Sequence, residues 1–320
     1  MFCRRNNESL LEKKSGFWYT CGKRNGIFLE GFYFHKKYAK YIRHTDYTEK
    51  PGRRQSMEER IATLRRILDG SAYTVALCGS GMMEEGGFAG IKGGDRAYEI
   101  EQKYGYSTEE IFASGFYTAR PMQFFDFYRE EMLKNIPEAT ESGKVLAQME
   151  RAGKLQCVIS SNIFEQGRRA GCKNVIYLHG SVYHNYCPKC GREYPMEYLR
   201  DAKGIPACET CGFPIRPGVY LFGEMVDSGL LSRAVDEIAK ADVLLLLGTN
   251  LHSEVFGNYI KYFGGKYLII IHKHSHYLDD TADMVFLDHP KNILPKLGYG
   301  EADGNGGSAE TADEAGKNGN

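Results

Sequence analysis

Hydrophobic and polar positions along the chain alternate between short apolar runs and longer windows with helical spacing. The apolar runs are rich in Val, Ile and Leu and predict buried parallel strands at 73–78, 156–160, 174–177, 241–247 and 266–271. The windows between them are amphipathic and predict helices at 57–68, 121–134, 141–151, 230–238 and 253–262. Strands that alternate with helices predict an α/β fold built on a doubly wound parallel sheet.

Two Cys-x-x-Cys pairs interrupt this alternation. They are Cys187 with Cys190 and Cys208 with Cys211, separated by seventeen residues and each followed by a glycine. Such pairs form tight turns that converge on one tetrahedral ion, so we expect a structural zinc bound by all four thiolates. The alternative, two disulfides, requires an oxidising compartment. A four-thiolate ion has no open coordination position, so catalysis is expected elsewhere.

The order of the predicted elements divides the chain into three parts and one insertion. Residues 1–55 are aromatic and basic, and we expect an N-terminal extension that packs on the core or forms a partner-binding arm. Residues 56–300 carry the predicted sheet, into which the cysteine pairs insert a small zinc-ribbon module at about 182–218. Residues 301–320 are rich in Gly, Ala, Asn and acids and are expected to be disordered.

Charge and hydropathy argue against several classes of function. The chain has 41 Lys and Arg and 41 Asp and Glu, so no net field favours nucleic acid or an anionic membrane. The longest apolar runs are too short to span a bilayer, and the first residues do not resemble a secretory signal. We therefore expect a cytoplasmic protein that binds neither membranes nor nucleic acids directly.

A glycine-rich turn directly follows the first predicted strand. Gly79, Ser80 and Gly81 lie where an open parallel sheet presents backbone N–H groups to a dinucleotide phosphate. The motif is incomplete, because Glu84 stands at the position of the third glycine and no acidic residue for a ribose is obvious about twenty residues later. By itself the turn is equally typical of a structural role.

Several further motifs occur in the order that one family shows. They are the turn and the glycines after it at 79–93, the segments 109–129, 160–171 and 178–181, the cysteine quartet, and the segments 216–224 and 248–251. On these motifs the chain resembles the sirtuin family of NAD-dependent protein deacylases over residues 71–297. The resemblance implies a Rossmann-like fold, NAD as cofactor and an acylated lysine in a protein or peptide as substrate. The acyl group would pass to ADP-ribose with release of nicotinamide.

The resemblance also implies roles for individual residues. His179 would be the catalytic base, which suits an imidazole with an ordinary pKa near 6.5, and Asn162 would bind the ribose or position water. Cofactor contacts are implied for Gly79, Ser80, Gly81, Lys92, Ser161, Asn162, Gly248, Thr249, Asn250 and His272. Substrate contacts, with the peptide paired as an added strand, are implied for Val219, Phe222, Gly223 and Glu224.

Several positions around the implied nicotinamide site depart from the family's pattern. Phe164 replaces the aspartate that recognises the nicotinamide amide. Ser161, Lys92 and Met83 replace a glutamine, an arginine and a serine. We expect nicotinamide to be held more weakly, because buried polar contacts are lost. Two alternatives to deacylation therefore stay open: an ADP-ribosyltransferase or NAD hydrolase on the same fold, and a non-catalytic module that binds NAD or ADP-ribose.

A group of histidines follows the last predicted strand. His272, His274 and His276 alternate along the chain, and on a strand their side chains would share one face. That arrangement suits a metal ion, but no carboxylate or cysteine stands at a suggestive spacing beside them. A second metal site is therefore not the favoured interpretation.

Overall fold

The computed structural model describes residues 55–91 and 93–300. The expected N-terminal extension as far as residue 54, Lys92 and the expected tail at 301–320 lie outside the described residues, and what was expected of them stays a prediction. Within the described ranges, no helix is long and apolar enough to cross a membrane.

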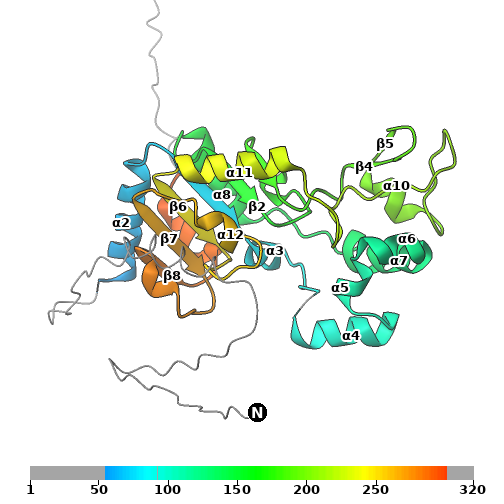
Figure 1. Cartoon of the computed structure of the whole chain (residues 1–320). Helices are drawn as coiled ribbons and strands as arrows, with labels where there is room; N and C mark the ends of the chain where they lie inside the picture. The colour runs from blue at the N-terminus through cyan, green and yellow to red at the C-terminus, as the bar shows by residue number, and fades with distance from the viewer. Residues whose placement is uncertain (1–54, 92, 301–320) are drawn as a thin grey trace, which may run out of the picture. The chain divides into compact units, whose positions relative to one another are not determined.

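A parallel sheet forms the largest regular element of the described chain (Figure 1). It has six strands in the order β3-β2-β1-β6-β7-β8. Their bounds are Thr74–Cys78 for β1, Cys157–Ser160 for β2, Val175–Tyr177 for β3, Val243–Leu247 for β6, Tyr267–His272 for β7 and Met284–Leu287 for β8. The chain winds outward from β1 in one direction and from β6 in the other, so the predicted doubly wound α/β fold is confirmed.

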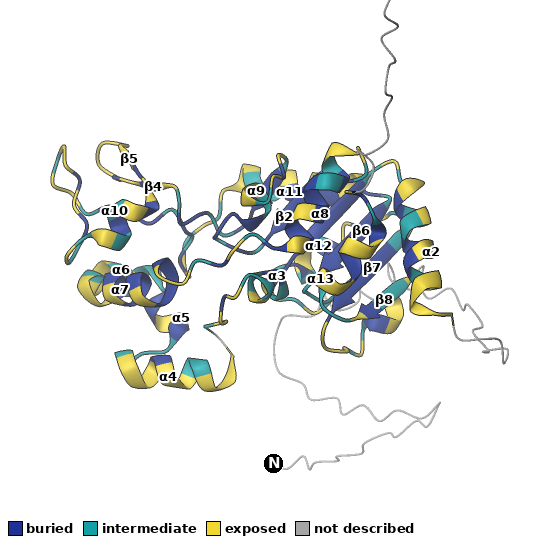
Figure 2. Cartoon of the chain, turned by 180° about the vertical axis from the view of Figure 1, so that it is seen from behind, coloured by how far each residue is buried: buried dark blue, intermediate teal, exposed yellow. Residues whose placement is uncertain are grey.

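Successive strand residues point to opposite faces of the sheet, and helices cover both faces. On one face, Ala76, Val158 and Leu245 pack in a cluster with buried residues of α2 (Met57–Asp69) and α8 (Glu141–Arg151). The short helices α13 (Pro290–Ile293) and η3 (Leu294–Leu297) contribute to the same cluster. Figure 2 shows these strands as almost entirely buried. Burial on both faces is the reason that the strands are continuous apolar runs.

The opposite face of the sheet packs against a second pair of helices. Val75, Leu77 and Leu244 cluster there with buried residues of α11 (Ser228–Lys240) and α12 (Gly257–Ile260). The predicted helix at 253–262 is thus reduced to the four residues of α12. The strand β8 is not predicted by the sequence pattern, because only one of its four residues is fully buried.

Side-chain caps mark the starts of the two longest helices, α2 and α11. Ser56 and Glu59 form a reciprocal capping box at the start of α2, with Ser56 Oγ accepting the Glu59 N–H at 3.2 Å. Asp227 caps α11 by accepting the Leu230 N–H at 2.7 Å. These local bonds fix where each amphipathic helix starts, and burial of its apolar face holds it on the sheet.

A third hydrophobic cluster is rich in aromatic side chains. Phe112 meets the rings of Phe124 and Phe127 edge-on, with centroids 6.3 and 5.5 Å away. The cluster includes the buried cysteines of the inserted segment, whose two-stranded antiparallel sheet pairs β4 (Asn185–Tyr186) with β5 (Glu193–Tyr194). The described chain therefore has a separate aromatic core for the helical and cysteine-bearing segments.

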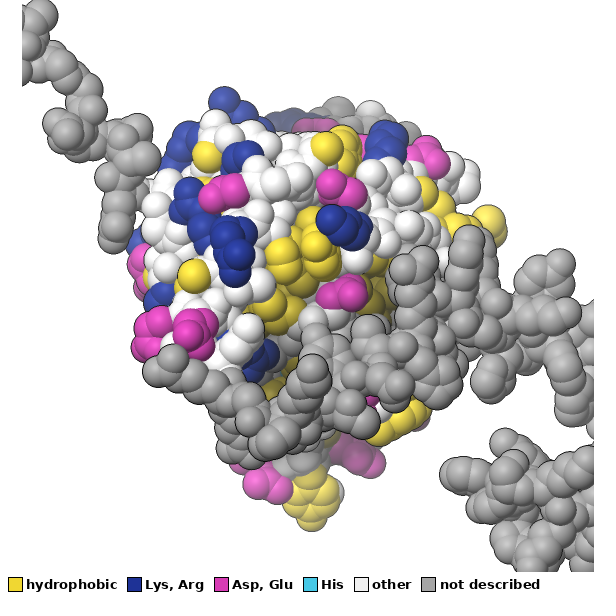
Figure 3. All heavy atoms as spheres, turned by 90° about the vertical axis from the view of Figure 1, so that its left-hand side faces the viewer, with side chains coloured by type: hydrophobic (Ala, Val, Ile, Leu, Met, Phe, Trp, Pro, Cys, Tyr) yellow, Lys and Arg dark blue, Asp and Glu magenta, His cyan; other side chains and the backbone are white. Residues whose placement is uncertain are grey.

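The remaining short elements connect these cores. They are α3 (Ser80–Glu85), α4 (Gly94–Tyr104), α5 (Thr108–Ile111), α6 (Ser114–Ala119), α7 (Pro121–Phe127), η1 (Tyr128–Leu133), α9 (Gln166–Arg169), α10 (Met196–Asp201) and η2 (Asp279–Thr281). The predicted helix at 121–134 is divided, because η1 is π-helical and buries five of its six residues. On the face shown in Figure 3, basic and acidic side chains are interspersed, in keeping with the balanced composition.

Candidate functional site

The candidate site follows the carboxyl edge of the sheet. The predicted residues there are His179 after β3, Ser161 and Asn162 after β2, Gly79, Ser80 and Gly81 after β1, Gly248, Thr249 and Asn250 after β6, and His272 at the end of β7. Because the strands are ordered β3-β2-β1-β6-β7, these residues succeed one another across neighbouring strands. The crevice between β1 and β6 is the point where an open α/β sheet binds ligands.

The two glycine turns at this crevice pack backbone against backbone. The Gly81 N–H donates to the Gly248 carbonyl at 3.0 Å, and the Gly79 N–H donates to the Leu247 carbonyl at 2.9 Å. A Cβ on Gly79 would lie 2.7 Å from the Gly248 carbonyl oxygen, and one on Gly81 would lie 2.7 Å from the Gly248 Cα. Glycine is therefore required at both positions by the approach of the two loops.

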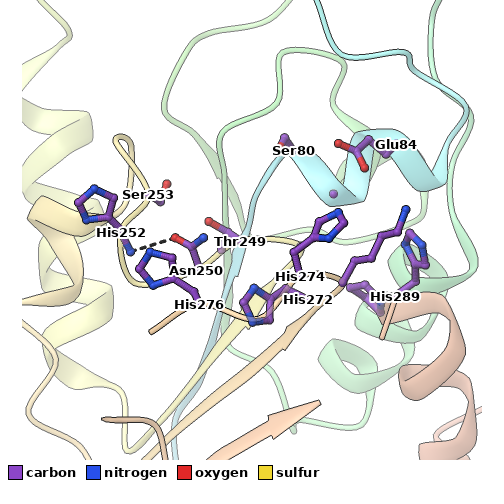
Figure 4. Close-up of a pocket in the computed structure, with 14 residues that line it drawn as sticks. Ser80, Glu84, Thr249, Asn250, His252, Ser253, His272, His274, His276 and His289 are labelled. Atoms are coloured by element: carbon purple, nitrogen blue, oxygen red, sulfur yellow. Dashed lines mark hydrogen bonds between the residues drawn. The ribbon is translucent and has the colours of Figure 1, made fainter. Parts of the chain in front are cut away.

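A cavity of about 420 Å³ opens beside these turns (Figure 4). Its lining contains the predicted cofactor residues Ser80, Gly81, Gly248, Thr249, Asn250 and His272. It also contains Glu84, His252, Ser253, Lys273, His274, His276, His289 and Pro290, which the sequence reasoning did not assign to the cofactor. Gly79, Ser161, Asn162 and His179 do not line this cavity, so the structure divides the predicted residues between two parts of the edge.

Asn162 is buried in the turn after β2. Its Nδ2 donates to Gln166 Oε1 at 3.0 Å, and its Oδ1 accepts the Phe164 N–H at 3.1 Å. An asparagine side chain can make four hydrogen bonds, so these two contacts fix its orientation and leave further capacity. Beside it, the Ser161 hydroxyl donates to the Cys78 carbonyl at 3.4 Å.

The loop that carries His179 pairs with the predicted peptide segment. The Tyr220 N–H donates to the His179 carbonyl at 3.0 Å, and Gly180 bridges Val219 in antiparallel fashion. Gly180 has a φ of 75°, and a Cβ there would lie 2.2 Å from the Gly218 carbonyl oxygen. The glycine after His179 thus permits the close pairing that positions this half-buried histidine.

The predicted peptide segment is itself held by its own contacts. Both Glu224 carboxylate oxygens accept from Arg216 Nη2, at 2.6 and 2.5 Å, and one also accepts the Leu221 N–H at 2.7 Å. The Phe222 N–H donates to the Phe112 carbonyl at 2.9 Å, while the Phe222 side chain is 48% exposed. Val219 is buried. These contacts fix the backbone of the segment, and Phe222 and Gly223 are its exposed predicted residues.

Phe164, the departure singled out in the sequence, is completely buried. Its ring lies 4.8 Å from that of Phe88, at an angle of 51°. Met83 and Ile91 pack against the same cluster. The sequence identifies Phe164 as unusual, but the aromatic partner at Phe88 is 76 residues away and is revealed only by the fold.

The four predicted zinc ligands are brought together. Their sulfur atoms all lie within 4.8 Å of one another, with 3.4 Å between Cys187 and Cys211 and 3.6 Å between Cys190 and Cys208. Zn–S bonds of about 2.3 Å place tetrahedral thiolates about 3.8 Å apart, so the quartet fits a zinc ion. All four are free cysteines, which excludes the alternative of two disulfides in this structure. A hydrogen bond from the Tyr194 hydroxyl lowers the pKa of Cys208 to about 5.

The histidines have a carboxylate partner that the sequence spacing does not indicate. A carboxylate does lie beside them: His272 Nε2 is 2.9 Å from Asp279 Oδ2, and both side chains are buried. The sequence spacing hid this contact because the chain ends β7 at His272 and turns back through the loop before η2. Among the described residues, only the cysteine quartet groups three or more possible metal ligands closely enough for one ion.

Comparisons with known proteins agree with this geometry. Residues 79–255 match the model of the Sir2 family. An NAD-dependent protein deacetylase of Clostridium perfringens (strain 13 / Type A) is 32% identical over 242 residues, which are 75% of this chain and 99% of that protein. A solved structure from a study of sirtuin substrate affinity has a TM-score of 0.67 at 26% identity, covering 76% of this chain and 98% of its own.

A Sir2 homologue solved as an NAD complex has a TM-score of 0.65 at 29% identity, over 74% of this chain and 91% of its own. The matched family region contains the glycine turns, Asn162, His179 and all four cysteines. From the extent of these matches, and from a sheet edge that gathers the expected motifs, it follows that the chain belongs to the Sir2 family, the sirtuins.

Proposed function

We propose that the chain is an NAD-dependent protein-lysine deacylase, which transfers the acyl group of a lysine to ADP-ribose and releases nicotinamide. The observation that carries this proposal is the backbone pairing of the loop that carries His179 with the segment at 218–222. It brings a candidate base to the strand expected to hold the peptide. A relative named as an NAD-dependent protein deacetylase, matched over nearly its whole length, supports the proposal.

The strand order gives NAD a direction along the site. His179 and Asn162 follow β3 and β2, so the nicotinamide ribose belongs at that end of the edge. Gly79 and Gly81 follow the central strand β1, where the turn can approach the pyrophosphate. When bound, NAD supplies the electrophilic ribose carbon and the nicotinamide leaving group.

The protein's main chemical task is proton removal. The imidazole of His179 would accept a proton from a ribose hydroxyl after nicotinamide has left, as neutral histidine can at physiological pH. Asn162, fixed by Gln166 and Phe164, would orient the ribose with its remaining hydrogen-bonding capacity. The zinc proposed for the cysteine quartet is coordinatively closed and takes no part in these steps.

The direct test uses the full chain, NAD and an acetylated peptide, with nicotinamide and deacetylated peptide measured by chromatography. We expect nicotinamide release that requires the peptide, and a loss of about 100-fold or more in His179→Ala, the scale of general-base catalysis. The matched control is His184→Ala, because His184 lies five residues away with a 61% exposed side chain. Equal losses in both variants would contradict the role of His179.

The altered nicotinamide surroundings support a second candidate, an ADP-ribosyltransferase or NAD hydrolase. The specific observation is the buried aromatic pair of Phe164 and Phe88, which offers no polar group to the nicotinamide amide. The same assay separates the candidates, because nicotinamide release without peptide would favour this one. No release at all, with ADP-ribose raising the unfolding temperature, would favour a non-catalytic binding module.

We further propose that the protein works in the cytoplasm and binds no nucleic acid directly. Cys78, Cys157 and Cys172 are buried free thiols, and the quartet is arranged for metal binding, as is typical of a reducing compartment. The equal numbers of acidic and basic residues support the absence of a nucleic-acid surface. Fractionation of cells that express the tagged chain tests the first point, and a gel-shift assay at low salt tests the second.

A further inference from the structure

The end of the cavity above β6 and β7 lies opposite the reactive end of the site. With the dinucleotide placed as in the proposed function, on which this inference rests, the adenosine ribose lies beyond the pyrophosphate, over β6 and β7. This is where Asn250 and His272 line the cavity. The side chains around them therefore decide which adenosine nucleotides can bind.

Histidines are concentrated at this end of the cavity. Five of the chain's nine histidines line it: His252, His272, His274, His276 and His289. They come from the loop after β6, from β7 and the loop beyond it, and from the residue before α13. The lining contains one lysine, Lys273, and one carboxylate, on Glu84. Three segments thus contribute to one surface rich in hydrogen-bond donors.

The arrangement of the imidazoles does not suit a metal ion. The rings of His252 and His276 are stacked, with centroids 5.6 Å apart and an interplanar angle of 18°. Figure 4 shows these two side by side, while His274 lies between His272 and the helix that carries Ser80 and Glu84. Their ring nitrogens form no group of three close enough for one ion among the described residues. An anion, which can accept from separate donors, is the better ligand class.

Hydrogen bonds determine which ring nitrogen of His276 can donate a proton to a ligand. Leu278 donates its backbone N–H to His276 Nδ1 at 3.2 Å, so the His276 proton must reside on Nε2 in the neutral ring. Asp279 Oδ2 contacts His272 Nε2 at 2.9 Å and accepts the His276 N–H at 2.7 Å. The Asp279 carboxylate is therefore engaged with the histidine loop itself, and the one carboxylate that lines the cavity, Glu84, lies on α3 with Ser80.

Sites for NAD commonly hold the adenosine ribose hydroxyls with a carboxylate, whereas sites for its ribose-phosphorylated form use a cationic side chain. Here the ribose end offers Lys273 and His274, both exposed, and the Asp279 carboxylate is turned to His272. We propose that this end of the cavity binds a phosphomonoester on the adenosine ribose, so that the protein binds ribose-phosphorylated adenosine nucleotides more tightly than unphosphorylated ones.

The binding should strengthen as the pH falls. Imidazoles have an ordinary pKa near 6.5, and a bound phosphate favours their charged form. The charged and titratable groups that face one another are His252 with His276, His272 with Asp279, and His289 with Glu85 and Asp288. Glu84, Lys273 and His274 complete the charged lining.

The test measures affinities of the full chain by isothermal titration for AMP, adenosine 2′,5′-bisphosphate and adenosine 3′,5′-bisphosphate. We expect at least one bisphosphate to bind about tenfold or more tightly than AMP at pH 6.5, and the ratio to fall several-fold at pH 8.5. The bisphosphate that binds identifies the phosphorylated hydroxyl. If both bind within twofold of AMP at pH 6.5, the proposal is overturned.

Variants test whether Lys273 and His274 are responsible for the bisphosphate preference. We expect Lys273→Gln and His274→Asn each to reduce the bisphosphate preference by about threefold or more, while Lys203→Gln, an exposed lysine outside the cavity, keeps it. Thermal unfolding verifies that each variant is folded, and an undiminished preference in both cavity variants would overturn the assignment. Deacylation with NAD is assayed separately. Activity without the preference would reject only this inference, and the preference without activity would reject only the deacylase.

Discussion

Phe164 and Phe88 form a fully buried ring pair in the region where the family's pattern places a carboxylate. Two aromatic side chains bury a large apolar area but present no polar group to an amide. The sequence reveals the substitution at Phe164, and the fold adds the partner ring that makes its surroundings apolar. The apolar pair is therefore expected to weaken the binding of nicotinamide. It does not alter the proposed base, His179.

We predict that free nicotinamide inhibits the protein only weakly, and that Phe164→Asp lowers the inhibitory concentration. A polar contact to a charged group contributes about 1.5 to 3 kcal/mol, so the change should be about tenfold or more. Inhibition curves for nicotinamide against peptide deacylation provide the measurement. Because a buried carboxylate can destabilise the core, Phe164→Asn serves as a second, uncharged variant. Unchanged inhibition in both folded variants would contradict the prediction.

At the scale of elements, the cysteine-bearing segment contains little regular structure of its own. Its strands β4 and β5 are two residues each and are held by few backbone hydrogen bonds. Cys187 and Cys208 are buried at the edge of the aromatic cluster. Such short strands cannot hold a fold by themselves, so the bound ion is expected to supply much of the segment's stability.

We predict that Cys187→Ser lowers the zinc content from about one ion per chain to nearly none and unfolds the segment. Zinc can be measured by mass spectrometry, and local unfolding by hydrogen exchange at 182–218. Cys172→Ser is the control, because Cys172 is a buried thiol outside the quartet and should leave zinc content unchanged. A folded Cys187→Ser segment without metal would count against the zinc site.

Elements also differ in how well the sequence predicts them. The five strands with both faces covered are predicted because each is a continuous apolar run. The edge strand β8 is missed, since it is mostly half-exposed and its pattern is weak. The π-helical turn at Tyr128–Leu133 is missed because no local signal distinguishes it from the helix that precedes it.

At the scale of the whole molecule, one side chain joins the amino ends of the two central strands, β1 and β6. Asp242, just before β6, accepts from Ser71 Oγ at 2.5 Å and from the backbone N–H groups of Ala72 and Tyr73 at 3.0 Å each. Burial opposes ionisation of this carboxyl, but these donors outweigh it and lower its pKa. The contact joins the approach to β1 with the start of β6, the two strands that border the site at their other ends.

This lowered pKa predicts a contribution to acid stability. A carboxyl whose pKa is lower in the folded state than its unfolded value, near 3.9, stabilises the fold fully above that value and loses the effect as the pH falls through the folded pKa. We expect Asp242→Asn to reduce the free energy of unfolding by about 1 to 2 kcal/mol at pH 6, and by less at pH 3.

Urea unfolding at pH 6, 4 and 3 provides this measurement. The control is Asp280→Asn, because Asp280 is exposed and should leave both the stability and its pH dependence nearly unchanged. If Asp242→Asn lost the same free energy at every pH, the ionised carboxylate would not be the source of the stability.

The sequence by itself determined five of the six strands of the parallel sheet, the order of the motifs, the cysteine quartet and the family, because each depends on residues close together along the chain. It also identified His179 and the glycine turns as candidates. Only the tertiary structure decided that His289 joins the histidines after β7, that Asp279 meets His272, and that Phe88 meets Phe164. These contacts arise because parallel strands bring the ends of distant segments to one edge, and no local pattern records which loops meet there.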